Sequence, residues 1–239
     1  MDVPATVRTA LADQPVEGKR SLEAGAGVGN ATAGLLAAGA ETVLSVTNDS
    51  EHAKTVRERV GTDHPDRVET VEADLREIPL ADDAVAVVTA HALFNVVPTR
   101  DLDRIAAELT RVAAPGGHLV IDDYAPLPED AAVRELFAVE NAVSELADGR
   151  SALTFYPADV LRGVFESQGW VFDRRKTLLD PVPWTESHVD AHVAEARERT
   201  ERIDGPLGAE LASEADALAE EIGSESAGEM YSLAFRVPD

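Results

Sequence analysis

A short run of glycines preceded by a carboxylate is the feature of this sequence best suited to bind a small molecule. Gly25, Gly27 and Gly29 stand at alternate positions, and Glu23 stands two residues before the first of them. Glycine tolerates positive φ and has no Cβ, so such a run can turn tightly and approach a ligand closely. Dinucleotide-binding loops have a two-residue step before the third glycine, which is missing here. A nicotinamide-dependent enzyme is therefore a weaker alternative.

The segments around this loop alternate between strand and helix. Ala84 to Thr89 is a near-continuous apolar strand, as expected in a parallel sheet buried on both faces. Because strand–helix alternation builds βαβ units, the sequence predicts an α/β fold with a doubly wound, mostly parallel sheet. The predicted strands span 19–23, 42–46, 67–71, 84–89, 118–121, 170–179 and 230–237. The predicted helices span 3–12, 30–38, 50–60, 101–113, 129–147, 157–168, 185–202 and 207–222.

Four motifs, in order along the chain, resemble those of class I S-adenosylmethionine-dependent methyltransferases. They are E-x-G-x-G-x-G at 23–29, Glu72-Ala73-Asp74-Leu75, the run IPLADD at 78–83, and Ala114-Pro115-Gly116-Gly117. The stretch 19–124 is most similar to the methyltransferases of ubiquinone and menaquinone biosynthesis and their small-molecule relatives. This resemblance implies a Rossmann-like sheet of seven strands with the last one antiparallel. A C-terminal helical pair at about 185–222 would precede that strand.

The resemblance also implies S-adenosylmethionine as the cofactor and suggests which residues hold it. In the family the glycine loop wraps the methionine part, and the acidic residue equivalent to Glu23 lies beside its amino group. An aspartate at the position of Asp74 binds the adenine amino group. The expected cofactor contacts are Glu23, Gly25, Gly27, Gly29, Thr47, Asn48, Asp74, Leu75 and Ala90.

The end of the second predicted strand departs from the family pattern. An acidic residue normally binds both ribose hydroxyls there, but this chain has Val46 or Thr47 at that position. Asn48 could bind the hydroxyls instead, and Asp49 could either reach them or cap the next helix. A hydrogen bond from the ribose hydroxyls to a neutral side chain is weaker than one to a carboxylate. A cofactor-binding sensor or partner subunit without chemistry is therefore the alternative to an active enzyme.

Methyl transfer from a sulfonium depends mainly on alignment of the reactants, so a general base is needed only when the acceptor must lose a proton. His91 is the candidate base, because it follows the fourth strand and ligands bind beyond the carboxyl ends of parallel strands. Its alternative role is packing or bonding within that loop. Further candidates are Asp122, Asp123 and Tyr124 at the end of the fifth strand, and Tyr156 and Trp184 as acceptor-pocket walls or as core residues.

The charge balance restricts the partners of the chain. It has 45 acidic and 21 basic residues, a net charge of −24, and no cysteine. Acidic residues spread along the whole chain suggest adaptation to a salty cytoplasm. Nucleic acid is disfavoured because its affinity comes from basic side chains that neutralise phosphates. A small-molecule acceptor is therefore expected. His188 and His192 have metal-ligand spacing on a predicted helix, but no third ligand is evident, so no metal is expected.

The organisation of the chain favours one domain over residues 1–239. Residues 19–124 would bind the cofactor, and residues 125–239 would form the acceptor part. The helix at 207–222 carries a narrow apolar stripe, which would dock on the domain or support a homodimer through the C-terminal helices. No apolar run approaches the about 20 residues that span a bilayer. Because the first eleven residues also lack signal-peptide features, a cytoplasmic protein is expected.

Overall fold

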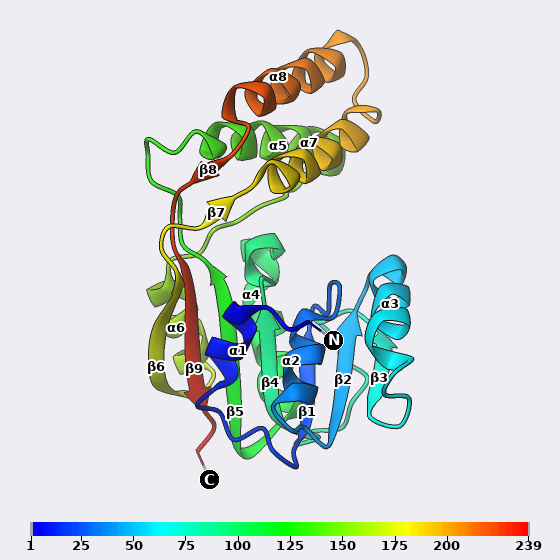
Figure 1. Ribbon diagram of the computed structural model, residues 1–239, viewed down its shortest axis with the longest axis vertical. Helices are drawn as coiled ribbons and strands as arrows, with labels where there is room; N and C mark the ends of the chain where they lie inside the picture. The colour runs from blue at the N-terminus through cyan, green and yellow to red at the C-terminus, as the bar shows by residue number, and fades with distance from the viewer. Residues whose placement is uncertain (1, 239) are drawn as a thin grey trace.

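A seven-stranded sheet lies at the centre of the computed structural model, which describes residues 2–238 (Figure 1). The strand order is β3-β2-β1-β4-β5-β9-β6. The first five strands in this order pair in parallel, and β9 runs antiparallel to both of its neighbours. The mostly parallel sheet with an antiparallel last strand is thus confirmed. The strands are β1 (Arg20–Ala24), β2 (Thr42–Thr47), β3 (Val68–Glu72), β4 (Val85–His91), β5 (Ala113–Tyr124), β6 (Val171–Leu179) and β9 (Met230–Arg236).

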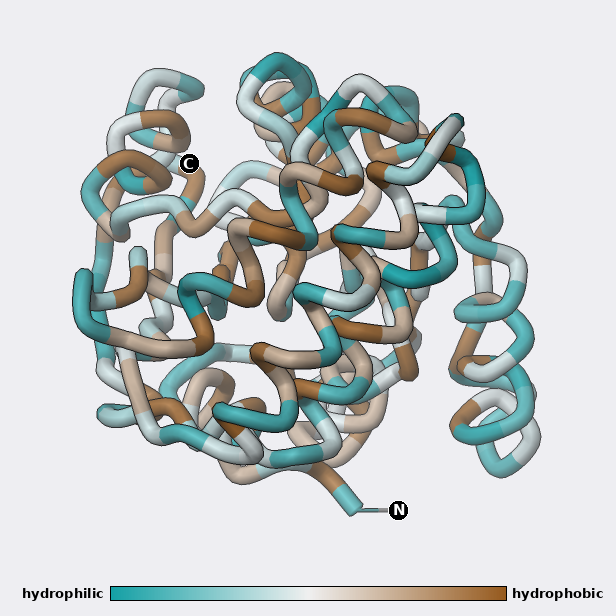
Figure 2. Tube along the Cα trace, turned by 90° about the horizontal axis from the view of Figure 1, so that it is seen from above, coloured by the Kyte–Doolittle hydropathy of each residue, from teal (hydrophilic) through white to brown (hydrophobic). Residues whose placement is uncertain are grey.

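Helices cover both faces of the sheet. One face carries α1 (Ala5–Leu11), α2 (Asn30–Ala37) and α3 (Ser50–Val56), and α3 continues as a π-helical turn, Arg57–Gly61. The other face carries α4 (Thr99–Val112) and α6 (Ala158–Ser167). Apolar and polar residues alternate along the helices that surround the sheet (Figure 2). This pattern lets each helix bury one face in the core and expose the other to solvent.

Three further helices form a separate layer beyond the carboxyl ends of the parallel strands (Figure 1). They are α5 (Val133–Asp148), α7 (Glu186–Thr200) and α8 (Pro206–Ile222), which pack on one another. Two short strands, β7 (Pro183–Trp184) and β8 (Glu225–Ser226), pair between this layer and the sheet. The apolar stripe of α8 docks within the chain, because Ala215, Leu218 and Ile222 belong to the core of the helical layer.

Two predicted boundaries differ from the structure for reasons that lie outside the local sequence. The long helix begins at Val133 instead of 129, because the Glu225 carboxylate of β8 accepts hydrogen bonds from the amides of Ala132 and Val133. The motif at 114–117, expected as a turn before the fifth strand, lies inside β5. There β5 advances from Ala113 to His118 while β4 advances only from Val85 to Val87, so the chain loops out within the strand.

Within residues 2–238, no helix is long and apolar enough to cross a membrane.

Candidate functional site

The glycine loop between β1 and α2 adopts a conformation that requires its glycines. Gly25, Gly27 and Gly29 have φ angles of 72°, 48° and 80°. A Cβ on Gly25 would lie 2.6 Å from the Leu93 side chain, whereas a Cβ on Gly27 would meet no atom closer than 3.9 Å. The amides of Gly25 and Ala26 donate to the Val46 carbonyl of β2 at 2.9 and 3.0 Å. The loop is therefore fixed to the sheet, and open space lies beside Gly27.

Glu23 fixes the other side of this loop. Its side chain is buried, with the residue 2% exposed, and it accepts hydrogen bonds from the amides of Ala31 and Thr32 at 3.1 and 2.8 Å. The Thr32 hydroxyl donates to the same carboxylate. Burial raises the pKa of Glu23 to about 7, although hydrogen bonds from Thr32 and the charge of His91 oppose this rise. A carboxylate from β1 thus satisfies the first-turn amides of α2, where the helix dipole favours negative charge.

A cavity of about 470 Å³ opens beside the loop. Seven residues expected at the site line it: Glu23, Gly25, Gly27, Thr47, Asn48, Leu75 and His91. Three of the expected cofactor contacts lie elsewhere. Gly29 is the N-terminal cap residue of α2, Ala90 is fully buried in the core, and Asp74 lines a second cavity.

At the end of β2, Asp49 has the capping role and also lines the first cavity. Its carboxylate accepts hydrogen bonds from the amides of Glu51 and His52 at 2.8 and 3.0 Å, so Asp49 caps α3. Thr47 is buried, and its hydroxyl accepts from the Asp49 amide. Asn48 lines both cavities, and its side chain makes no hydrogen bond with any residue in 2–238. Asn48 is therefore a polar side chain without a partner in this range, next to the capping residue Asp49.

Asp74 lies at the end of β3 in an ion pair with Arg76. The Arg76 guanidinium reaches both carboxylate oxygens of Asp74, at 2.6 to 3.0 Å, and also contacts Asp101 at 3.2 Å. Its hydrogen bonds lower the pKa of Asp74. The carboxylate is thus ionised and oriented, and its contact with adenine stays a prediction.

His91, at the end of β4, is oriented by a buried carboxylate of the neighbouring strand. Its Nδ1 lies 3.2 Å from Asp122 Oδ2. Burial lowers the pKa of His91, but the hydrogen bond and charge of Asp122, with the charge of Glu23, outweigh this effect, and the net shift is upward. A histidine held by a carboxylate is the arrangement of a general base. The raised pKa means that it keeps its proton over a wider pH range.

Asp123 has a different role from Asp122, although the two are adjacent. Its carboxylate accepts hydrogen bonds from the amides of Phe94 and Asn95, at 2.7 and 3.1 Å, and from that of Tyr124. Burial raises the pKa of Asp123 to about 7, while these backbone hydrogen bonds oppose the rise. Asp123 therefore holds the turn after β4 in place. Tyr124 lines the cavity beside the glycine loop.

Neither aromatic residue considered for an acceptor pocket lines the two cavities of the site. The buried Tyr156 donates its hydroxyl to the Val97 carbonyl at 2.9 Å. Trp184 packs against Tyr124 and Phe137 in the core of the helical layer. Their large apolar surfaces are buried by packing, and each polar atom finds a backbone carbonyl. Both are core residues.

The two histidines with metal-ligand spacing bind different partners. His188 closes a capping box with Thr185 at the start of α7, and His192 Nδ1 lies 2.7 Å from the buried Glu140 of α5. In the described part of the chain, no three His, Asp or Glu residues form a group that could hold a metal ion.

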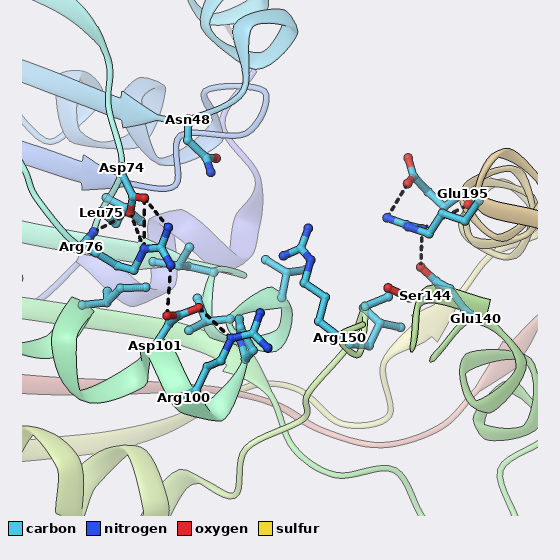
Figure 3. Close-up of a pocket in the computed structure, with 18 of the residues that line it drawn as sticks. Asn48, Asp74, Leu75, Arg76, Arg100, Asp101, Glu140, Ser144, Arg150 and Glu195 are labelled. Carbon is cyan, nitrogen blue, oxygen red and sulfur yellow. Dashed lines mark hydrogen bonds and ion pairs between the residues drawn. The ribbon is translucent and has the colours of Figure 1, made fainter. Parts of the chain in front are cut away.

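A second cavity, of about 610 Å³, lies between the sheet and the helical layer (Figure 3). It shares Asn48, Leu75, Leu93 and Val96 with the first cavity, so the two adjoin. Sequence reasoning missed most of its lining, because these residues come from separate segments without a shared motif. The charged residues of this lining are Asp74, Arg76, Arg100, Asp101, Glu140, Arg150, His192, Glu195 and Arg199.

The family model described as "Methyltransferase domain" matches residues 22–121. Over these residues the chain is similar to methyltransferase domains. The match includes the glycine loop, the end of β2 and the turn after β4, which together line the first cavity. Demethylmenaquinone methyltransferase of Clavibacter sepedonicus is 40% identical over 124 residues, 51% of this chain and 48% of that protein. A ribosomal RNA small subunit methyltransferase A of Rhodopseudomonas palustris is 31% identical over 111 residues, 45% of this chain and 38% of that protein.

The chain therefore spans less than half the length of these curated relatives. Solved structures share its fold over nearly its whole length. A protein of Bacillus halodurans has a TM-score of 0.68 at 17% identity, covering 99% of this chain and 100% of that one. The cyclase SpnF has a TM-score of 0.63 at 19% identity, covering 98% and 80% of the two chains. The fold around the methyltransferase domain thus also occurs in a protein described as a cyclase.

The contact between His91 and Asp122 leads to a pH prediction. Asp122→Asn should lower the pKa of His91, measured by NMR titration of the imidazole. Because the folded-state pKa is raised, the pair stabilises fully below the ordinary histidine pKa of about 6.5 and loses this effect as pH rises through the folded pKa. The variant should therefore lose more unfolding free energy at pH 5.5 than at pH 9. The exposed Asp103→Asn is the control, and an unchanged His91 titration in Asp122→Asn would contradict the assignment.

Proposed function

We propose that this chain transfers the methyl group of S-adenosylmethionine to a small-molecule acceptor. The observation that carries the proposal is the pair of adjoining cavities, one built on the glycine loop and the other against the helical layer. In this proposal, the cavity on the glycine loop holds the methyl donor, and the cavity across the shared wall of Asn48, Leu75, Leu93 and Val96 holds the acceptor. The methyltransferase domain match covers the donor side of this wall.

The residues present fit the cofactor. The Glu23 carboxylate lines the first cavity and suits the cationic methionine end, while the open side of Gly27 leaves room for a ligand. Asn48 supplies a free amide for the ribose hydroxyls, and Leu75 supplies an apolar contact for the adenine ring. Asp74, which lines the second cavity next to the shared Leu75, is proposed to bind the adenine amino group where the two cavities meet. The cofactor supplies an activated methyl group, so the protein has mainly to align the reactants and exclude water.

His91 is proposed as the base for an acceptor that must lose a proton. It lines the first cavity, and Asp122 fixes the orientation of its ring through Nδ1, which leaves Nε2 for the acceptor. In this proposal, residues 19–124 hold the cofactor and residues 125–239 form the acceptor part of one domain spanning 1–239. A small acceptor is favoured over RNA because the net charge is −24.

Cofactor binding without chemistry is the second candidate, and the neutral Asn48 at the end of β2 favours it. A ribose contact without charge weakens binding and is tolerated where turnover is not required. The two candidates differ in one observable, because only the enzyme forms S-adenosylhomocysteine when supplied with acceptors.

Calorimetric titration with S-adenosylmethionine, S-adenosylhomocysteine and NADH tests the donor site. The first two should bind with micromolar affinity, and NADH should not bind. Gly27→Val should abolish this binding while the circular dichroism spectrum stays unchanged, because the added side chain occupies the open space beside the loop and strains its backbone only locally. Gly18→Val is the matched control, because Gly18 is exposed, also has a positive φ of 68° and has open space at its Cβ. Normal binding by Gly27→Val, or binding of NADH alone, would refute the proposed site.

The pKa of Glu23 gives a second prediction. Affinity for S-adenosylmethionine should rise as pH increases through about 7, because the carboxylate ionises there and the ligand is cationic. Glu23→Gln should bind more weakly and lose this pH dependence, whereas the exposed Glu58→Gln should keep it. A wild-type affinity that is flat between pH 5.5 and 8.5 would show that the carboxylate does not face the ligand's positive charge.

We also propose a cytoplasmic location at high salt concentration, on the basis of the distributed acidic charge. Self-repulsion within a chain of net charge −24 destabilises the fold at low ionic strength, and salt screens it. The unfolding midpoint should therefore rise between 0.1 M and 2 M KCl, as followed by circular dichroism. A midpoint that falls over this range would rule against adaptation to salt.

A homodimer through the C-terminal helices also belongs to the proposal. Leu207 is an exposed large apolar residue at the start of α8. Light scattering coupled to size-exclusion chromatography would measure the mass in solution.

A further inference from the structure

The second cavity differs in charge from the rest of the molecule. Its lining contains four carboxylates and four arginines, so these charges balance, whereas the whole chain has a net charge of −24. A negatively charged ligand would therefore meet much less repulsion here than over the average surface.

The four carboxylates of this lining already have cationic partners. Arg76 binds Asp74 at 2.6 Å and Asp101 at 3.2 Å. On the opposite wall, Arg199 binds Glu195 at 3.0 Å. Glu140 lies 2.7 Å from His192 and 3.6 Å from Arg199. Each acidic side chain thus has a cationic partner, although Arg76 and Arg199 are each shared by two carboxylates of the lining.

Two arginines of the lining, Arg100 and Arg150, have no acidic partner within hydrogen-bonding distance in residues 2–238. Arg150 makes no hydrogen bond or ion pair with any residue in 2–238, although the chain has an excess of carboxylates. Arg100 makes one long contact, of 3.8 Å, with Asp101, which Arg76 contacts more closely at 3.2 Å. Two guanidinium groups without strong partners are thus available to a ligand.

The positions of these two arginines place them at one binding point. Arg100 lies in the first turn of α4, and Arg150 follows the end of α5. Both line the second cavity and also a neighbouring groove of about 410 Å³, so they lie where the two spaces meet. Figure 3 shows both side chains extending into the space between the sheet and the helical layer.

An apolar wall connects this point to the first cavity. Leu93 and Val96 line both cavities, and Val96 is 48% exposed, which is unusual for a large apolar side chain. Ile105 and Leu153 extend the apolar lining of the second cavity. This wall suits the hydrocarbon part of a ligand whose charged group lies at the arginines.

We propose that the methyl acceptor is a small organic anion, with a carboxylate or phosphate group held between Arg100 and Arg150. Its apolar part lies along Leu93 and Val96 and presents the reacting atom to the first cavity. This inference rests on the proposed function, because it assigns the acceptor side of the same site. Arginine binds both kinds of anion through paired N–H donors.

The test measures binding of matched probes to the protein loaded with S-adenosylhomocysteine, at constant ionic strength. The probes are 3-phenylpropanoate and phenyl phosphate, each observed by saturation-transfer NMR and compared with the neutral 3-phenylpropanamide. At least one anion should bind, with the amide bound about tenfold more weakly or not at all. Preference for the carboxylate or for the phosphate then identifies which anionic group the site takes.

Variants locate the binding point. Arg150→Gln and Arg100→Gln should each weaken binding of the anion by about tenfold. Arg134→Gln should leave this binding unchanged, because Arg134 is an exposed residue of α5 outside the cavity. S-adenosylhomocysteine affinity should stay unchanged in all three, which also shows that each is folded. Equal binding of the neutral amide, no binding of either anion, or full binding by the Arg100→Gln/Arg150→Gln double variant would overturn the proposal. Failure of S-adenosylhomocysteine to bind the wild type would instead overturn the proposed function.

Discussion

The buried carboxylate of Glu23 is the interaction on which the donor site depends. A carboxylate in the core is costly unless hydrogen bonds surround it, and here the first turn of α2 supplies them. The same bonds satisfy helix amides that would otherwise lack partners. Strand, loop and helix are therefore fixed together at one point, and the glycine conformations between them follow from this short connection. The geometry that stabilises the fold here also shapes the cavity.

Two buried carboxylates at the end of β5 also fix neighbouring parts of the structure. Asp122 and Asp123 are adjacent, and successive side chains on a strand point to opposite faces. One therefore reaches the ring of His91, and the other reaches the amides of the turn after β4. The turn carries Leu93 and Val96, which separate the two cavities. The relative placement of the two cavities thus depends on two neighbouring carboxylates of one strand.

Much of the fold could be predicted from the sequence, because the alternation of strands and helices and the glycine spacing are local properties. The role of Asp49 could not be decided, since a cap and a ligand contact require the same residue at the same place. The start of α5 depends on Glu225, a residue 92 positions after Val133 in the chain. The second cavity was missed for the same reason: Arg100 and Arg150 carry no shared motif, and only the tertiary fold brings them to one lining. Tyr156 and Trp184 turned out to be core residues, because the polar atoms of both find backbone partners.

The segment that carries α7 and α8 leaves the sheet after Leu179 and rejoins it at Met230, and these two residues face each other in the β6–β9 ladder. Its entry and exit are therefore neighbours, held by strands that pair independently of the segment itself. Changes of length between these points do not by themselves separate the paired strands, although α5 packs on α7 and α8. The helical layer can therefore vary more freely than the sheet beneath it. For protein engineering, residues 180–229 are therefore a segment that could be exchanged as a unit between related proteins.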